Sequence, residues 1–279
     1  MEVRLLSCAH QPFRIIWKVF LLVFVVMATV TYQKYLVDRT MKVVIIIVLI
    51  SLSSLVNAQD GIAVVELFTS QGCSSCPSAD RLLTKLMEEA ESEGKTLFPL
   101  SFHVSYWNYL GWIDPYSSDD FTNRQRLYSS RLKTSNIYTP QMVVNGKHEF
   151  VGSNRALAKT SIDEVYNDEP LVGLELTEVD RSEDQVKYNF NWDGPLGGYV
   201  LNVALVERDI ENYVPRGENR GRTLHHDNVV RFFTTYNSAK SGSVTVDLPG
   251  DAILENCSVV LYAQGKQNRE VVGATAKAL

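Results

Sequence analysis

The chain has 279 residues, which is enough for one large domain or two of ordinary size. Hydrophobic residues make up 45% of it and charged residues 21%, proportions that are typical of a folded globular protein and exclude a disordered one. The net charge of -5, without basic patches, gives no reason to expect a nucleic-acid partner.

Two apolar segments open the chain, at residues 19–30 and 43–56, and both are shorter than the about 20 apolar residues of a comfortable membrane span. The second is typical of a secretory signal, with a charged start at Met41-Lys42 and a small-residue cleavage site at Val56-Asn57-Ala58. We therefore expect residues 1–58 to be an N-terminal extension and signal peptide, Met41 to be the working start, and the protein to be periplasmic or secreted. The alternative is that residues 1–40 add an anchor, and the two segments remain as a membrane hairpin.

Residues 59–168 alternate between strand and helix patterns. A branched apolar run at 62–68 predicts a buried strand, and residues 78–93 place their leucines on one helical face before Gly94. Further along, Asn145-Gly146 predicts a tight hairpin turn. The remaining expected elements are strands at 96–104, 141–144 and 148–151 and helices at 118–132 and 155–167.

Between the first strand and the first helix lie two cysteines, Cys73 and Cys76, in a C-x-x-C spacing followed by Pro77. Thiols at this spacing share one turn, so their sulfurs can reach disulfide distance. The free amides and dipole of a helix N-terminus favour a thiolate at Cys73, which makes it a nucleophile. Pro77 fits the first helical turn, where its missing N–H has no partner to lose. Cys257 is a leftover thiol in an apolar run, where we expect it to be buried and inert.

The order of elements, with C-x-x-C after the first strand and Thr139-Pro140 before the third, resembles the thioredoxin fold. Thioredoxin-like proteins carry a cis proline at that position, facing the cysteines, and Pro140 matches it. The resemblance implies that Pro140 presents a backbone edge to an incoming peptide. It departs from thioredoxin at Gly72, where that protein has tryptophan, and at the Ser74-Ser75 pair.

A longer set of motifs resembles the secreted family called domain of unknown function 1223, over almost the whole chain after the signal. The motifs are Val65 to Pro77 (VELFTSQGCSSCP), Tyr106-Trp107 with Leu110-Gly111-Trp112, Arg124-Gln125, Tyr138 to Gly146 (YTPQMVVNG) and Gly221 to Leu224 (GRTL). This resemblance implies an exported thioredoxin-like fold and redox chemistry, and names no substrate.

From residue 169 to 279 the pattern changes to alternating, strand-length runs, which predict a second domain that is an antiparallel β-sandwich. The fold class we expect is therefore an α/β thioredoxin-like domain followed by a β-sandwich. The longest connection, residues 208–227, is expected to be an irregular loop. Its basic residues could bind an anion or a metal, contact the first domain, or be only solvated; they are Arg216, Arg220, Arg222, His225 and His226.

The function we expect is an exported thiol-disulfide oxidoreductase acting on protein thiols and disulfides of the cell envelope, without a cofactor. Cys73 attacks, Cys76 resolves the mixed disulfide, and Pro140 holds the partner. Glu66 is either a buried general base for Cys76 or a strand-end carboxylate in an ion pair. Three further side chains are expected either to line a peptide groove beside the cysteines or to pack in the core: Thr139, Trp107 and Trp112. This function requires Cys73 to be exposed, with a lowered pKa.

Two alternatives remain open from the residues. The C-x-x-C pair can be a permanent structural disulfide in a redox-inert binding protein. It can also hold copper(I), a soft ion that two thiolates suit, with His103 as a third ligand; a histidine on an apolar strand is otherwise a hydrogen-bonded core residue. The prediction adopted here contains no metal ligand.

Overall fold

The computed structural model describes residues 20–22, 24–27, 29 and 61–279. Residues 20–22, 24–27 and 29 are helical, and the rest of the expected signal region, including Met41 and its cleavage site, lies outside the described residues. Within the described part of the chain, no helix combines the length and the hydropathy that a membrane crossing requires. Residues 61–279 form one compact unit, which is described by itself.

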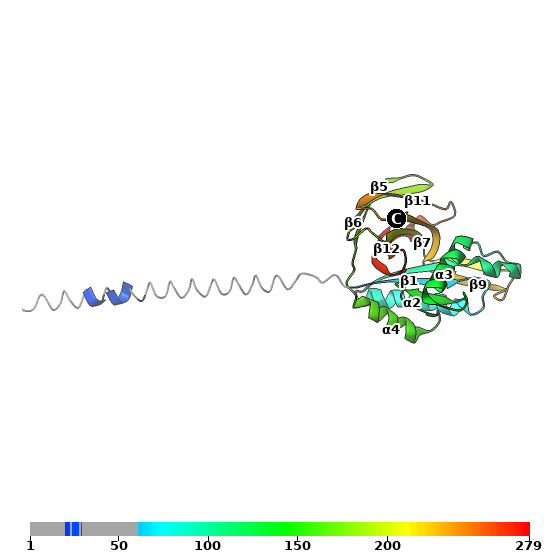
Figure 1. Ribbon diagram of the computed structural model, residues 1–279, viewed down its shortest axis with the longest axis horizontal. Helices are drawn as coiled ribbons and strands as arrows, with labels where there is room; N and C mark the ends of the chain where they lie inside the picture. The colour runs from blue at the N-terminus through cyan, green and yellow to red at the C-terminus, as the bar shows by residue number, and fades with distance from the viewer. Residues whose placement is uncertain (1–19, 23, 28, 30–60) are drawn as a thin grey trace, which may run out of the picture. The chain divides into compact units, whose positions relative to one another are not determined.

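The centre of this unit is an eight-stranded sheet in the order β13-β12-β7-β10-β2-β1-β3-β4. A three-stranded sheet, β11-β6-β5, and a two-stranded hairpin, β8-β9, complete the strands (Figure 1). The bounds of the elements are β1 Ile62–Thr69, α2 Cys76–Ser92, β2 Thr96–His103, η1 Ser105–Leu110, α3 Asp119–Leu132, β3 Gln141–Val144, β4 His148–Val151, α4 Arg155–Tyr166, β5 Gly173–Arg181, β6 Gln185–Asp193, β7 Tyr199–Glu207, β8 Ile210–Val214, β9 Arg222–His226, β10 Val229–Asn237, β11 Ser241–Asp247, η2 Leu254–Asn256, β12 Cys257–Gly265 and β13 Val271–Ala278.

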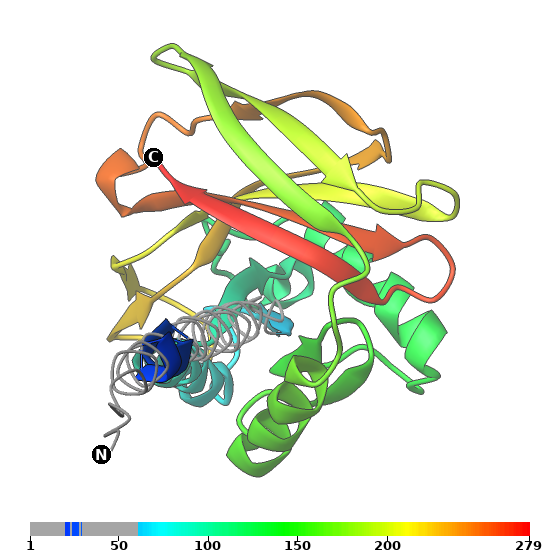
Figure 2. The ribbon, with the colours of Figure 1, turned by 90° about the vertical axis from the view of Figure 1, so that its left-hand side faces the viewer.

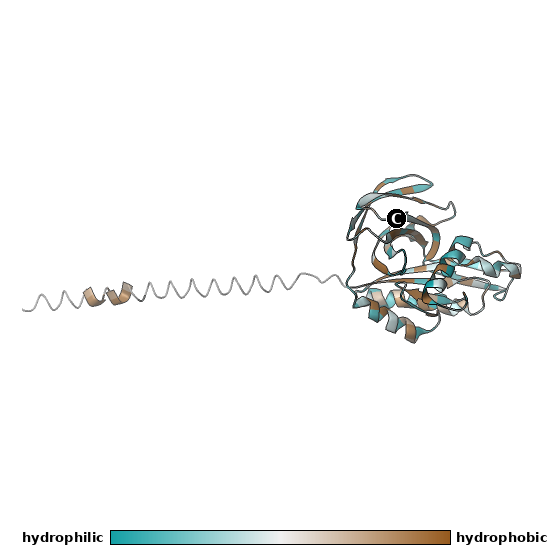
Figure 3. Cartoon of the chain, in the orientation of Figure 1, coloured by the Kyte–Doolittle hydropathy of each residue, from teal (hydrophilic) through white to brown (hydrophobic). Residues whose placement is uncertain are grey.

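Strand β1 is buried along its whole length because helices cover both of its faces. Val65 and Leu67 pack with α2 and α4, whereas Val64 and Phe68 belong to the cluster that includes α3. The central strands are largely hydrophobic, and the visible side of α3 is largely hydrophilic (Figure 3). This two-sided cover explains the continuous apolar run in the sequence.

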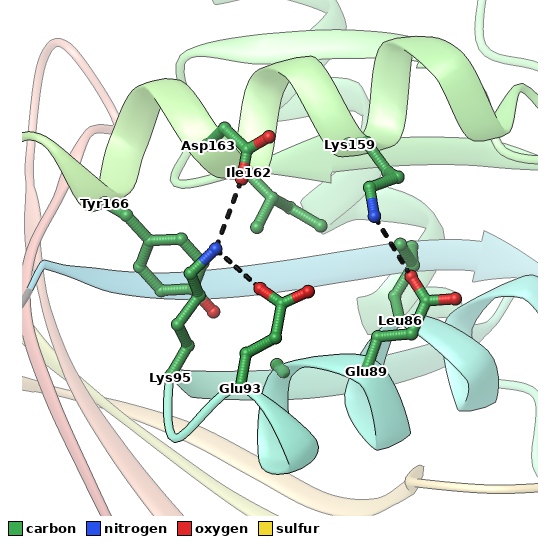
Figure 4. A pocket seen from close by; sticks show the side chains of 9 residues that line it. Leu86, Glu89, Glu93, Lys95, Lys159, Ile162, Asp163 and Tyr166 are labelled. Carbon is green, nitrogen blue, oxygen red and sulfur yellow. Dashed lines mark hydrogen bonds and ion pairs between the residues drawn. The ribbon is translucent and has the colours of Figure 1, made fainter.

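Helices α2 and α4 lie next to each other, and ion pairs close the seam between them (Figure 4). Lys95 pairs with Glu93 at 2.7 Å and with Asp163 at 3.5 Å, while Lys159 lies 3.4 Å from Glu89. The small hollow between these helices is therefore lined by charges that already have partners.

The eight-stranded sheet runs across residue 168, where the sequence suggested a boundary between two domains. Strands β7, β10, β12 and β13 come from the C-terminal region and extend the sheet that β1 to β4 begin. The junction is the parallel contact of β10 with β2, where Ser101 N–H donates to the Asn228 carbonyl at 2.8 Å. The sandwich-like part is the three-stranded sheet, which is stacked on the C-terminal strands of the large sheet (Figure 2). Its Tyr188 lies in one buried cluster with Val203 of β7 and Leu261 of β12.

The expectation of an irregular loop at residues 208–227 is wrong. The segment forms the hairpin β8-β9, paired from Ile210 with His226 to Val214 with Arg222. Buried Ile210, Val214 and Leu224 hold it to the rest of the unit, and residues 215–221 form the irregular tip between the two strands. The strands are short and rich in polar residues, so the period-2 pattern is weak.

Candidate functional site

The two cysteines lie in the tight turn between β1 and α2. Cys73 N–H donates to the Ser70 carbonyl at 3.2 Å, and Cys76 N–H donates to the Cys73 carbonyl at 3.3 Å. Helix α2 begins at Cys76, with Pro77 in its first turn as expected. Both cysteines are free thiols and both are buried. The expectation of an exposed Cys73 is therefore wrong, because its side chain is 1% accessible.

The two thiols have opposite acidities. A hydrogen bond with Cys76 lowers the pKa of Cys73 to about 6 against the opposing effect of burial, and hydrogen bonds with Ser75 and Thr139 lower it further. The Ser75 hydroxyl lies 3.3 Å from the Cys73 sulfur. Burial raises the pKa of Cys76 far above that of an ordinary thiol, and the hydrogen bond with Cys73 raises it further. At neutral pH the turn therefore holds one thiolate, on Cys73, and one thiol, on Cys76.

Two of the expected substrate-binding residues, Thr139 and Trp107, lie beside Cys73. The Thr139 carbonyl is 3.8 Å from the Cys73 sulfur, and the Thr139-Pro140 peptide bond is cis. Trp107, in η1, donates its indole N–H to the Thr139 hydroxyl at 2.7 Å. The beginning of β3 and the 3-10 helix that follows β2 thus meet at the thiol.

Trp112 reaches the cysteine turn through Gln71 rather than through the thiols. The Gln71 side-chain oxygen accepts from Trp112 Nε1 at 3.1 Å and from Asn212 Nδ2 at 2.8 Å. These two donors fix the amide orientation, so Gln71 Nε2 donates to His226 Nε2, 3.3 Å away. Because Nε2 accepts this hydrogen bond, the ring hydrogen of His226 is on Nδ1, the nitrogen that lies 3.5 Å from Asp80 Oδ2.

Glu66 is not aimed at Cys76; the ion pair, the other possibility that the sequence left open, is what the structure contains. Arg124 Nε and Nη2 donate to the two carboxylate oxygens of Glu66 at 2.6 and 2.8 Å. Arg124 Nη2 also donates to the hydroxyl of Tyr262, on β12, at 2.7 Å. Because successive side chains of a strand point to opposite faces, Glu66 faces α3 while its neighbours face α2.

The carboxylate that acts on Cys76 belongs to Asp80, a residue that the sequence analysis did not select. Asp80 lies four residues after Cys76 in α2, so the two side chains share one helix face. Its charge contributes to the raised pKa of Cys76. Asp80 is buried, its Oδ2 lies 3.5 Å from His226 Nδ1, and its Oδ1 has no hydrogen-bond partner among the described residues. The i, i+4 spacing from Cys76 was the available signal.

Two histidines extend this buried polar group. The ring centroids of His103 and His226 are 4.9 Å apart. His103 Nδ1 lies 2.7 Å from Asp114 Oδ2; burial opposes protonation, but the Asp114 charge raises the pKa of His103 above its ordinary value. In the part of the chain that the structure describes, no group of three or more His, Cys, Asp or Glu side chains could hold a metal ion. His103 Nδ1 is paired with the Asp114 carboxylate.

The tip of the β8-β9 hairpin covers the cysteine turn. Asn219 is fully buried, and its Nδ2 donates to the carbonyl oxygens of Gln71 at 3.0 Å and Cys73 at 2.8 Å. The Glu218 carboxylate accepts from Ser74 N–H at 2.9 Å. These contacts join residues about 146 positions apart in the chain and hold the hairpin tip against the backbone of the cysteine turn.

Comparisons with known proteins give a family and one solved structure of similar architecture. A family model described as "Protein of unknown function (DUF1223)" matches residues 64–264. A crystal structure of a protein from Agrobacterium tumefaciens is 28% identical and covers 78% of this chain and 95% of its own, with a TM-score of 0.54. A domain of the outer membrane lipoprotein Omp28 from Porphyromonas gingivalis is 14% identical, covering 40% of this chain and 90% of its own, with a TM-score of only 0.23. No curated protein matches.

Proposed function

Because the chain belongs to the DUF1223 family, whose description names no activity, we propose its function from the site itself: an exported, thioredoxin-like thiol-disulfide oxidoreductase. The observation that carries the proposal is the opposite acidity of Cys73 and Cys76 within one turn. A thiolate is the nucleophile in disulfide exchange, and a neighbouring thiol that keeps its proton can wait as the resolving group. A cysteine pair with only a structural role needs no such difference. Because Cys73 is 1% accessible, exchange with a partner requires the residues around Cys73 to move.

The thioredoxin-like description has two supports. The elements from β1 to α4 follow in the order strand, helix, strand, helix, strand, strand, helix, with the cysteines after the first strand. The cis bond before Pro140 lies beside Cys73, where the resemblance to thioredoxin expects it. Export rests on the signal-like sequence at residues 41–58.

In the reducing direction, the Cys73 thiolate attacks one sulfur of a partner disulfide. The partner S–S bond breaks, its second sulfur leaves as a thiolate, and a mixed disulfide joins Cys73 to the partner. Cys76 then loses its proton and attacks the Cys73 sulfur, which releases the partner's other thiolate and forms the Cys73-Cys76 disulfide. Two electrons pass to the partner, and the same steps reversed oxidise a partner dithiol.

Asp80 takes the proton of Cys76 in the second step. It lies one helical turn from Cys76, and its Oδ1, which no described residue hydrogen-bonds, is free to accept a proton. The other carboxylate oxygen of Asp80, Oδ2, lies 3.5 Å from His226 Nδ1. Asp80→Asn should therefore slow release of the mixed disulfide, while the first attack by Cys73 continues. Glu88→Gln is the matched control, since it removes an exposed carboxylate from the same helix, α2, and leaves every buried ion pair intact.

The test of the function is the midpoint potential of the Cys73/Cys76 couple, measured by alkylation and mass in graded thiol buffers. We expect a value within about -270 to -120 mV, the range of cycling proteins with this fold. Cys76→Ser should trap mixed disulfides with envelope proteins, and Cys73→Ser, its matched control, should trap none. A pair that stays oxidised well below about -300 mV would instead make the protein a redox-inert binding protein with a structural disulfide.

A further inference from the structure

The hairpin tip that covers the cysteines has an outer side with a different character. Its inner side is bound to the cysteine turn through Asn219 and Glu218. Its outer side forms an open groove of about 580 Å³, lined by Leu110, Pro215, Arg216, Gly217, Glu218 and Arg220. The groove reaches the turn itself, because a side chain at Gly217 would meet the backbone of Gly72, the residue before Cys73, at 3.6 Å.

The groove is positively charged in a chain whose net charge is -5. Arg216 and Arg220 are both exposed, and among the described residues neither forms an ion pair. The carboxylate in the groove, Glu218, is occupied by the N–H of Ser74. Arg222, at the base of the tip, donates to Asn219 Oδ1 at 2.7 Å and adds a third positive charge. Two free guanidinium groups can each receive a carboxylate in bidentate geometry.

Two exposed tyrosines lie close in sequence to residues that line the groove. Tyr109, next to Leu110, is 77% exposed and stacks on Trp107 with a centroid distance of 6.5 Å. Tyr213, at the end of β8 before Pro215, is 59% exposed. Tyrosines that present an apolar ring and a polar hydroxyl are enriched where polypeptides bind. The combination of an open groove, two free arginines and two exposed tyrosines fits an extended polypeptide better than a small anion, which needs an enclosed site.

We propose that this groove binds an acidic segment of the partner protein, so that the protein selects cysteines flanked by aspartate and glutamate. The inference rests on the proposed function and names its substrate class. The charges lie on the hairpin tip, which is hydrogen-bonded to the backbone of Cys73 and Ser74, so a partner bound in the groove lies beside the cysteine turn. Gly217 and Gly221, both in the left-handed region at φ +82° and +79°, bound the part of the tip that carries Glu218 and Asn219.

The experiment compares three peptides that each carry one cysteine activated as a disulfide with neutral 2-thiopyridine. Their flanking residues are glutamate, glutamine or lysine. With the Cys76→Ser protein, Cys73 attacks the peptide sulfur and releases pyridine-2-thione, whose absorbance gives the rate. We expect the glutamate peptide to react about tenfold faster than the glutamine peptide and the lysine peptide to be slowest, with the difference falling as salt rises.

Arg216→Glu/Arg220→Glu, added to Cys76→Ser, should reverse that order. The matched control is Lys187→Glu/Lys277→Glu, an equal charge change at two exposed positions on β6 and β13, and it should keep the original order. Uncharged dithiodipyridine reports the Cys73 thiolate itself and should react equally with both variants. Equal rates for the three peptides, or an order that the control pair also reverses, would overturn the proposal while leaving the redox function intact. No reaction with dithiodipyridine would overturn both.

Discussion

Replacing Arg124 with methionine should lower the free energy of unfolding by about 3–5 kcal/mol, because it leaves a buried carboxylate without its counter-charge. Glu66 is 1% exposed and Arg124 is 8% exposed, so neither solvent nor a mobile side chain can take over. After the substitution, the hydroxyl of Tyr128 remains as the hydrogen-bond donor to Glu66. The substitution also removes the hydrogen bonds that Arg124 donates to Tyr262 and Gln264 on β12. It should therefore weaken the packing of α3 against the C-terminal strands as well.

The size of this effect is measurable against a total stability of about 5–15 kcal/mol. For a unit of this length, 1 kcal/mol corresponds to about 2–4 °C in Tm, so the expected shift is about 6–20 °C. Urea unfolding of the reduced protein, followed by circular dichroism at constant pH, gives the free energy if the slope with urea is unchanged.

The decisive comparison is the double variant Glu66→Gln/Arg124→Met, which removes both charges. It should recover at least half of the stability lost by Arg124→Met alone, because an ion pair replaced as a whole costs little compared with one that is broken. The reasoning would be refuted if Arg124→Met unfolded within about 1 kcal/mol of the wild type. It would also be refuted if the double variant were no more stable than the single one.

Three further outcomes follow from the site and its surroundings. Ser75→Ala removes one hydrogen bond to the Cys73 sulfur and should raise the pKa of Cys73 by about half to one unit, read from the pH dependence of its alkylation; an unchanged profile would show that the hydroxyl does not reach the thiolate. Because the pKa of Cys73 is lowered from 9.0 to about 6, the stability that its thiolate gives the reduced protein is complete above pH 9 and is lost as pH falls toward 6. The unfolding free energy should therefore rise between pH 6 and pH 9, and Cys73→Ser should make this rise smaller. An equal slope in both proteins would contradict the prediction. Gly146→Ala should cost about 2 kcal/mol or more in urea unfolding, since φ is +65° and a Cβ would overlap the Arg269 carbonyl; a near-neutral result would mean that the turn can rearrange.

Elements with clear local chemistry could be predicted from the sequence. Strands β3 and β4 have the bounds that their apolar runs and the Asn145-Gly146 turn indicated. The β8-β9 hairpin could not be predicted in this way. Its strands are five residues long, and the residues buried in them are Ile210, Val214, Leu224 and His226. Local pattern carries little information when a short hairpin is held by a few distant contacts.

The site was only partly predictable for a related reason. Cys73, Thr139 and Trp107 were selected from motifs, and they do meet in the structure. Glu66 was selected on a strand buried on both faces, where the sequence does not say which face the thiols occupy. Asp80 required only helical geometry, because four residues separate it from Cys76. Counting helical turns from Cys76 thus indicates the neighbouring carboxylate, Asp80, better than the position of Glu66 on its strand does.

The continuity of the sheet explains how a hairpin from the C-terminal region comes to cover the cysteines. Strand β7 ends at Glu207 and β10 begins at Val229, and these two residues pair with each other. Val229 also pairs with Ser101, two residues before the end of β2. The hairpin between β7 and β10 therefore leaves the sheet at the edge where β1 and β2 end, which is where the cysteine turn begins. The C-terminal strands do not form an appended module; they place Asn219 over Cys73, and the junction at Ser101 is the contact on which that placement depends.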